Sequence, residues 1–156
     1  MLATVQRVSQ AEIFVDEKIF SSIGPGCLVF VCVEQDDTSQ SIIDMVSKIL
    51  NFRMLDGPKG ITTSALKDSS EEVLIVSQFT LAAITNKGNK PSFHRAANPD
   101  DAKLLYDEFV CEFKNSFSNV QEGKFGAFME ISLTNKGPVT FNFKTCLLYT
   151  SDAADE

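Results

Sequence analysis

The sequence lacks the side-chain sets that carry most hydrolytic and metal-dependent chemistry. It has one histidine, His94, no Gly-x-Ser-x-Gly motif, and no recognisable Cys–His or carboxylate couple. A serine or threonine nucleophile needs a base within hydrogen-bond reach, and that base needs an orienting partner. His94 has no obvious paired acid, so a catalytic triad is not expected. One histidine and scattered cysteines also give no metal-ligand spacing, so neither a metal nor a cofactor is expected.

The four cysteines, Cys27, Cys32, Cys111 and Cys146, show no C-x-x-C spacing. Two of them fall in an apolar run and Cys111 in a helical pattern, which indicates reduced, buried thiols. No apolar run approaches the roughly 18 residues of a membrane span. The first residues also lack the basic and apolar segments of a secretory signal. We therefore expect a cytoplasmic protein with no membrane partner.

Length and charge indicate one domain followed by a short tail. A chain of 156 residues, 44% of them hydrophobic, is enough for one domain with one core. Residues 146–156 carry three acids and no base, and their back-translation resembles a transposase sequencing adapter. We expect residues 1–145 to be the domain and residues 146–156 to be non-native. The net charge of −7 is unfavourable for nucleic acid, but it falls to −4 without the tail.

The apolar pattern predicts an α/β single domain of largely antiparallel sheet with two long helices. Strands are expected at residues 3–8, 12–15, 27–33, 73–81, 120–125, 129–133 and 139–143. The run at 27–33 does not alternate, which predicts a strand buried on both faces. One helix should begin after Thr38 and end near residue 52, and a second should begin at Asn98-Pro99. The second helix should turn four side chains inward: Leu104, Leu105, Phe109 and Phe113.

A long polar loop, residues 85–98, precedes the second helix. Loops of this length in compact domains are usually functional or mobile. This loop carries Lys87, Lys90 and Arg95. These bases are either a solvated surface or a set of phosphate contacts.

The first motif of interest is Ser77-Gln78-Phe79-Thr80-Leu81, at the end of a predicted strand. Ser77 or Thr80 could be read as a nucleophile, but nothing nearby in the sequence would activate either hydroxyl. The plain structural alternative is that both are strand residues satisfied by backbone hydrogen bonds, with Phe79 in the core.

The second motif is Asn135-Lys136-Gly137-Pro138-Val139-Thr140, between two predicted strands. The structural alternatives are a trans Gly-Pro turn and a hairpin corner, since only about 5–6% of X-Pro bonds in folded proteins are cis. Glycine is also the residue required where backbone must approach another group closely.

Together the two motifs resemble the signature motifs of the D-aminoacyl-tRNA deacylases. Further similarity lies in four segments: Gln6-Arg7-Val8, residues 23–26, residues 87–93 and residues 123–126. The resemblance covers about residues 1–145. It implies a barrel-like domain, a homodimer whose active site is completed across the interface, and aminoacyl-tRNA as substrate.

The family resemblance also implies roles for particular residues. Ser77, Gln78, Phe79 and Thr80 would surround the terminal adenosine and the ester carbonyl, whose developing charge main-chain N–H groups would hold. The substrate's own 2′-hydroxyl would assist a water, so that the protein mainly positions and polarises. Gly137 and Pro138, joined by a cis bond, would enter the partner's pocket and exclude L side chains by crowding. Ala97 and Met129 would lie near the pocket, and Lys87, Lys90 and Arg95 near the tRNA acceptor end.

The implied reaction is hydrolysis of the ester bond of D-aminoacyl-tRNA, and of glycine mischarged on tRNA-Ala, as proofreading in translation. Three departures from the family pattern are expected to alter pocket edges or tRNA preference: Phe128 in place of a usual Asp, Ile84, and Ile61-Thr62-Thr63. Two alternatives remain open. One is a non-catalytic nucleic-acid-binding dimer on the same fold, and the other is a small-molecule-binding oligomer with a trans bond before Pro138.

Overall fold

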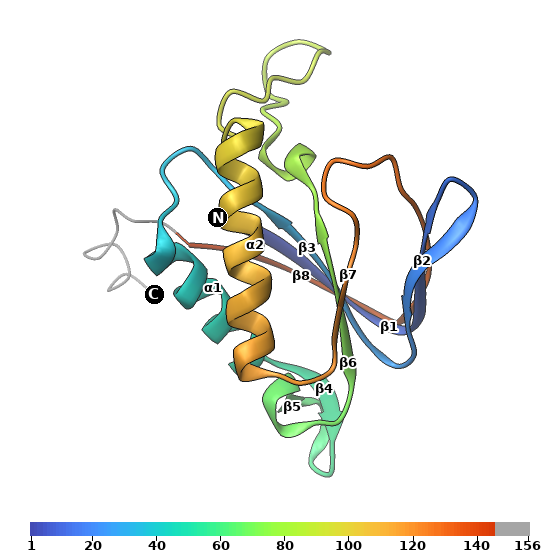
Figure 1. Cartoon of the computed structure of the whole chain (residues 1–156). Coiled ribbons are helices and arrows are strands. Elements are labelled where there is room, and N and C mark those ends of the chain that lie inside the picture. Colours follow the sequence, from blue (N-terminus) through green and yellow to red (C-terminus); the bar gives the residue numbers. More distant parts are fainter. Residues whose placement is uncertain (146–156) are drawn as a thin grey trace.

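The computed structural model describes residues 1–145, which form a six-stranded mixed sheet, a two-stranded sheet and two α-helices (Figure 1). The strands are β1 (Leu2–Val15), β2 (Lys18–Ile23), β3 (Gly26–Cys32), β4 (Arg53–Gly57), β5 (Gly60–Ala65), β6 (Glu72–Ser77), β7 (Val120–Glu122) and β8 (Glu130–Lys144). The helices are α1 (Ser39–Asn51) and α2 (Pro99–Ser116), with 3₁₀ helices at Leu66–Asp68 and Phe79–Ala82. The expected non-native tail, residues 146–156, lies outside the described residues.

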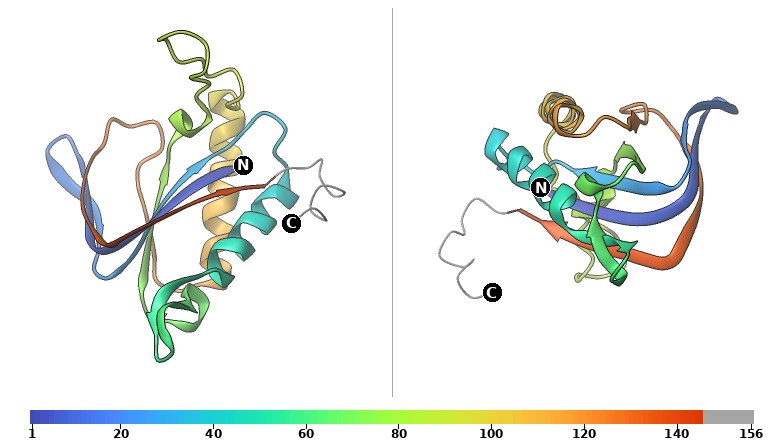
Figure 2. Two further views of the ribbon diagram at one scale, coloured as in Figure 1. Left: turned by 180° about the vertical axis from the view of Figure 1, so that it is seen from behind. Right: turned by 90° about the horizontal axis from the view of Figure 1, so that it is seen from below.

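The long strand β1 organises the larger sheet. Its first half pairs with β3, its second half pairs with β2, and β8 pairs along its other edge, all antiparallel. β6 then adds to β3, and β7 to β6, in parallel. The sheet therefore curls back over itself (Figure 2), in agreement with the predicted barrel-like α/β domain.

The central strands are buried on both faces, as their unbroken apolar sequence predicts. In β3, Cys27, Val29 and Val31 face the larger core beneath the helices, whereas Leu28 faces a second core. β1 contributes Ala3 and Val5 to the first core. It then contributes three residues to the second core: Val8, Ala11 and Ile13. One strand thus serves both cores because the sheet bends along its length.

Both helices lie on one face of the sheet and begin where the sequence predicts, after Thr38 and at Pro99. Asn98 caps α2 by accepting the Asp101 N–H at 3.0 Å, and Pro99 occupies the first helical position. α1 buries an apolar stripe at helical spacing, made of Ile42, Met45, Val46, Ile49 and Leu50. Within residues 1–145, neither helix combines the length and the apolarity needed to cross a membrane.

Several predicted elements need correction. The strand expected at 73–81 ends at Ser77, because the chain turns into a 3₁₀ helix there. The segment expected at 120–125 is a three-residue strand, parallel to β6. The segments 129–133 and 139–143 are one strand, β8, and the expected break between them lies inside it. Leu104 is 70% exposed, since the inner face of α2 is instead formed by Tyr106, Phe109, Val110 and Phe113.

Candidate active site

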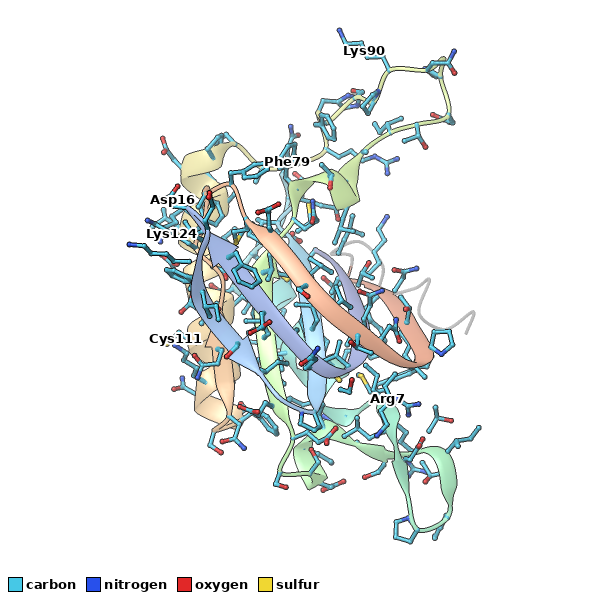
Figure 3. The ribbon with its side chains drawn as sticks, turned by 90° about the vertical axis from the view of Figure 1, so that its right-hand side faces the viewer. Arg7, Asp16, Phe79, Lys90, Cys111 and Lys124 are labelled. Carbon is cyan, nitrogen blue, oxygen red and sulfur yellow. The ribbon has the colours of Figure 1, made fainter. Side chains whose placement is uncertain are left out.

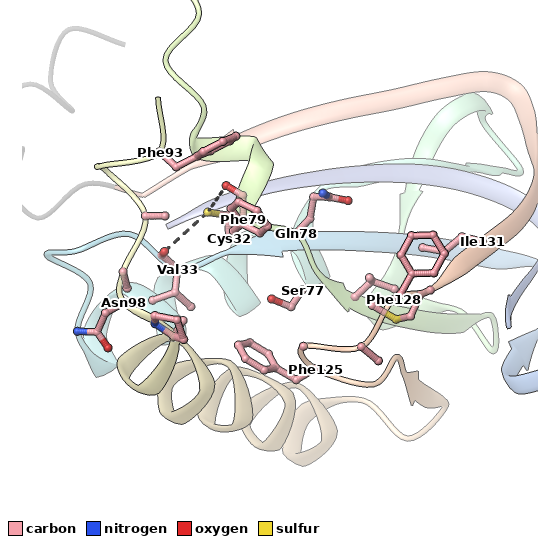
Figure 4. A pocket seen from close by; sticks show the side chains of 18 residues that line it. Cys32, Val33, Ser77, Gln78, Phe79, Phe93, Asn98, Phe125, Phe128 and Ile131 are labelled. Carbon is pink, nitrogen blue, oxygen red and sulfur yellow. Dashed lines mark hydrogen bonds between the residues drawn. The ribbon is translucent and has the colours of Figure 1, made fainter. Parts of the chain in front are cut away.

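An apolar cleft of about 680 Å³ lies where β6 ends, between the start of α2 and the chain that leads into β8 (Figure 4). The cleft is lined by Cys32, Val33, Val76, Ser77, Gln78, Phe79, Phe93, Ala96, Ala97, Asn98, Pro99, Ala102, Phe125, Gly126, Ala127, Phe128, Met129 and Ile131. Its size is within the range of small-molecule sites in proteins. The residues come from four separate stretches of the chain, 32–33, 76–79, 93–102 and 125–131, so the fold, rather than any one segment, makes the cleft.

The first motif forms the floor of this cleft. The Gln78 N–H donates to the Val31 carbonyl at 2.9 Å, and the 3₁₀ helix then begins at Phe79. Helix geometry leaves the first N–H groups of such a turn without acceptors inside it, which here are those of Phe79 and Thr80. Of these two residues, Phe79 lines the cleft next to Ser77, so its N–H is a main-chain donor available there.

The side chains of the motif do not follow the plain structural alternative. Phe79 is 58% exposed and stacks edge-on against Phe93 at 5.1 Å between ring centroids, so it is not a core residue. Thr80 is exposed and does not line the cleft, but its hydroxyl accepts a hydrogen bond from the Gln78 amide. Ser77, Gln78 and Phe79 thus face the cleft. Thr80 lies outside it, and its hydroxyl holds the Gln78 side chain in place.

Ala97 and Met129 both line the cleft, Ala97 from just before α2 and Met129 from just before β8. The Ala97 N–H donates to the Val33 carbonyl at 3.0 Å, which ties the start of α2 to the end of β3. Met129 packs over Gly123, where a Cβ atom would lie 2.9 Å from the methionine sulfur. An alanine at position 123 would therefore displace the Met129 side chain.

The cleft wall also holds a cysteine whose thiol is neutral at ordinary pH. Burial raises the pKa of Cys32 to about 11, and its sulfur lies 3.7 Å from both the Phe79 and the Val33 carbonyl oxygen, either of which can accept its one S–H (Figure 4). Such a thiol is a weak nucleophile because the thiolate is the reactive form. Burial likewise raises the pKa of Cys27 to about 12. Cys111 is exposed, which corrects the expectation that it is buried.

His94 takes no part in a triad with Ser77. Its Nδ1 atom lies 2.8 Å from the Ser92 hydroxyl, and it faces a different hollow beside the chain's amino group. Arg95 lines that same hollow with Glu34 and Asp37. Lys87 and Lys90 are exposed on the long loop, and Figure 3 shows Lys90 at its outer end. The loop therefore projects from the side of the molecule that holds the cleft, and its outer end does not cover the cleft.

The second motif is a bulge inside β8, and we call its residues 136–139 the elbow. Val8 of β1 faces Asn135 and Gln6 faces Thr140, so Arg7 alone stands opposite the four elbow residues. The Gly137–Pro138 peptide is cis, unlike the trans turn that the residues alone suggested, and as the family resemblance implies. The Asn135 side chain accepts the Val139 N–H at 2.8 Å and so closes the base of the elbow.

Arg7 holds the elbow from the neighbouring strand. Its Nε donates to the Lys136 carbonyl at 2.9 Å, and its Nη1 donates to Asp56 at 2.8 Å. A Cβ atom on Gly137 would lie 3.0 Å from Arg7 Nη2 and 2.7 Å from a Val139 methyl group. Gly137 also has φ +136°, which L side chains rarely adopt. Glycine is therefore required here both for space and for backbone angle.

The elbow does not reach the cleft of its own chain. Gly137 and Pro138 are exposed and are not among the cleft residues. Figure 3 shows Phe79, on the cleft, and Arg7, beside the elbow, toward opposite ends of the sheet. Within one chain the two motifs are separate surfaces.

The sequence-based prediction placed Phe128 at the pocket edge, but it missed Phe125, Gly126 and Ala127 on the same wall of the cleft and the contacts of Arg7. The turn at Gly126 (φ +76°) was the available signal for the wall. Nothing in the sequence paired Arg7 with Asp56, which lies 49 residues away. Among residues 1–145, no group of three His, Cys, Asp or Glu side chains is placed to hold a metal ion.

The chain combines a curled mixed sheet, an apolar cleft and an exposed elbow. These features agree with the D-aminoacyl-tRNA deacylase class that the two motifs resemble. The family described as D-Tyr-tRNA(Tyr) deacylase matches residues 4–144. The chain belongs to this family.

Relatives that match nearly the whole chain are named D-aminoacyl-tRNA deacylase. That of Francisella tularensis subsp. novicida is 44% identical over 144 residues, covering 92% of this chain and 99% of its own. That of Cupriavidus metallidurans is 43% identical, covering 90% and 94%. Among solved structures, the c-Myc DNA Unwinding Element Binding Protein has a TM-score of 0.90 at 36% identity, covering 94% of this chain and 99% of its own. A probable eukaryotic D-amino acid tRNA deacylase has a TM-score of 0.81 at 20% identity, covering 91% and 97%, which supports the fold.

Proposed function

We propose that this protein hydrolyses the ester bond of D-aminoacyl-tRNA, releasing the D-amino acid and free tRNA. The observation that carries the proposal is the main-chain floor of the cleft, at Ser77 to Phe79, in a chain that matches the deacylase family over residues 4–144. Relatives more than 40% identical carry the deacylase name. The protein is thus a carboxylic ester hydrolase that serves translation quality control, and we propose that it acts in the cytoplasm, where translation uses this substrate.

The floor performs the chemistry mainly by positioning. The ester carbonyl oxygen gains negative charge when water attacks, and N–H groups fixed beside it stabilise that charge. The Phe79 N–H is suited to this role because the 3₁₀ turn leaves it without an acceptor inside the turn and Phe79 lines the cleft. The neighbouring 2′-hydroxyl of the terminal ribose assists the water, which agrees with a floor that lacks an activated side-chain nucleophile.

Selection of the D enantiomer requires a second copy of the chain. The elbow is exposed and stands away from its own cleft, and it is held rigid by Arg7 and Asn135. In a homodimer, Gly137 and Pro138 enter the partner's cleft and lie against the substrate Cα. An L side chain would collide with this backbone, whereas a D side chain points away and glycine has none. Glycine mischarged on tRNA-Ala is therefore also a substrate.

The cleft walls and the long loop recognise the rest of the substrate. Ala97 has a small side chain, which leaves room for the substrate in the cleft. Met129 supplies an adaptable apolar surface in the same cleft. The exposed rings of Phe79 and Phe128 lie on the rim, where unpaired bases stack on aromatic side chains. Lys87, Lys90 and Arg95 contribute phosphate contacts beside the acceptor end, which the exposure of the loop supports.

Release of tyrosine from D-tyrosyl-tRNA and L-tyrosyl-tRNA tests this function. The purified chain should release D-tyrosine far faster than L-tyrosine at equal substrate concentration. Equal release from both, or release from neither, would refute the proposal.

A second candidate function is nucleic-acid binding without hydrolysis. It is favoured by one observation, the similarity to a solved protein named for binding a DNA unwinding element. This candidate predicts DNA or tRNA binding that persists while the D-aminoacyl ester stays intact, so the same release assay separates the two.

A further inference from the structure

The β4–β5 hairpin forms a sheet of its own and lies beside the elbow. Its strands, Arg53–Gly57 and Gly60–Ala65, pair only with each other. Figure 3 shows this hairpin next to Arg7, at the end of the molecule away from Phe79. The hairpin has no part in the cleft, so its position next to the elbow needs another explanation.

A continuous set of hydrogen bonds joins the hairpin to the elbow. Asp56 Oδ1 accepts from Arg7 Nη1 at 2.8 Å and from the Thr62 N–H at 3.2 Å. Arg7 Nη1 also lies 3.4 Å from the Met54 carbonyl, and Arg7 Nε donates to the Lys136 carbonyl at 2.9 Å. Both ends of the guanidinium group are thereby fixed, one by the hairpin and one by the elbow.

Burial makes the carboxylate important to Arg7. The Arg7 side chain is only 10% exposed, and Asp56 is its salt-bridge partner among residues 1–145. A charged group held mostly out of water is destabilised when its counter-ion is removed. Without Asp56, Arg7 would turn toward solvent or another acceptor, and the bond to the Lys136 carbonyl would be lost with it.

The hairpin in turn is shaped to present the carboxylate. Thr62 has φ +50°, an unfavourable angle for a β-branched residue, and its N–H is the group bound by Asp56. The hydrogen bond from the Thr62 N–H lowers the pKa of Asp56 most, and the hydrogen bond from Arg7 lowers it next. The hairpin therefore holds Asp56 ionised in one orientation.

We propose that Asp56 is a positioning residue for the elbow, acts through Arg7, and thereby sets how strictly the enzyme rejects L-aminoacyl-tRNA. The inference rests on the proposed function, because it assigns the elbow to discrimination of handedness. Exclusion by crowding is sensitive to small displacements, and a misplacement of about 1 Å can change a rate on the order of a hundredfold. Asp56 itself touches neither the floor nor the substrate.

The test compares Asp56→Ala and Asp56→Asn with a matched control, Asp107→Ala. Asp107 is as exposed as Asp56 (51% against 49%) and also pairs with one base, Lys103, but it lies on α2 away from the elbow. Release from L-tyrosyl-tRNA and from D-tyrosyl-tRNA is measured for each protein, together with the melting temperature.

We expect Asp56→Ala to raise the rate of L-tyrosine release at least about tenfold. Asp56→Asn, which keeps an acceptor oxygen, should give a smaller rise, and the control should match the parent protein. An unchanged L-tyrosine rate in both Asp56 variants would overturn the inference, whatever happens to the D-tyrosine rate or the melting temperature. Failure of the parent protein to release D-tyrosine would instead refute the proposed function.

Discussion

Arg7 on β1 donates from Nε to the carbonyl of Lys136 on β8, at 2.9 Å, across a bulge where one residue faces four. This bond fixes the first peptide of the elbow from the strand beside it. The Arg7 side chain is mostly buried, so little water competes with the Lys136 carbonyl for its guanidinium group. It explains how an exposed segment can be rigid enough to serve as a steric filter.

Arg7→Lys should weaken both the fold and the discrimination of handedness. Lysine has a single ammonium group and cannot reach Lys136, Asp56 and Met54 from one position. We expect unfolding in urea to show a loss of about 1.5–3 kcal/mol, the range for hydrogen bonds to charged groups. Arg53→Lys, at an exposed position on β4, is the control. Equal stability of the Arg7 and Arg53 variants would contradict the role of this contact.

Gly137→Ala should lower the rate of D-tyrosine release at least about tenfold, because the displaced elbow would press on the substrate that it lies against in the partner's cleft and shift it from the floor. The added Cβ atom would lie 2.7 Å from a Val139 methyl group and 3.0 Å from Arg7 Nη2, so the elbow must shift. Gly60→Ala is a close control, since Gly60 has φ +130° but open space around it. If both variants lose the same activity, backbone angle rather than crowding is responsible.

Phe128→Ala should raise the KM for aminoacyl-tRNA with little change in kcat. Phe128 is 86% exposed on the cleft rim, where it is available to stack on a base. Stacking contributes about 1–3 kcal/mol per base, so a rise in KM on the order of tenfold is expected. Phe128→Tyr should retain the parent KM. Leu104→Ala, which removes another exposed apolar side chain (70% exposed) from α2, should also leave the KM unchanged.

Alkylation should distinguish the cysteines of the described domain. Burial raises the pKa of Cys27 to about 12 and of Cys32 to about 11, so both remain thiols at pH 8. Cys111 is exposed on α2. Brief treatment of the folded protein with iodoacetamide should modify Cys111 first, as read by peptide mass spectrometry. Early modification of Cys32 would show that the cleft wall opens in solution.

The sequence predicted the parts of the fold that local physics determines. Asn98-Pro99 marks the start of α2 because capping and proline geometry act within one turn. β3 was recognisable because a strand buried on both faces needs an unbroken apolar run. The two motifs marked the segments that hold the cleft and the elbow: Ser77, Gln78 and Phe79 line the cleft, as do Ala97 and Met129, whereas Thr80 does not. The catalytic and selective roles of these residues stay predictions.

Relationships between distant segments were not predictable in the same way. β7 has three residues and pairs in parallel with β6. A pattern this short does not show whether a strand pairs in parallel or antiparallel. β8 continues through Gly137-Pro138 because β1 supports it on both sides of the bulge. The exposure of Phe79 follows from the 3₁₀ turn that ends β6, whereas its apolar character suggested burial. The bond between Arg7 and Asp56 depends on how the β4–β5 hairpin docks, which no local pattern encodes.

Subunit complementation tests most directly whether a site is built from the floor of one chain and the elbow of another. Ala97→Phe fills the cleft but leaves the elbow intact, whereas Gly137→Ala displaces the elbow but leaves the cleft open. Each variant alone should release little D-tyrosine. After mixing and subunit exchange at equal amounts, half the dimers are mixed and each has one intact site, so activity should return to about a quarter of the parent value. Activity of the mixture no higher than the average of the two variants would contradict the account.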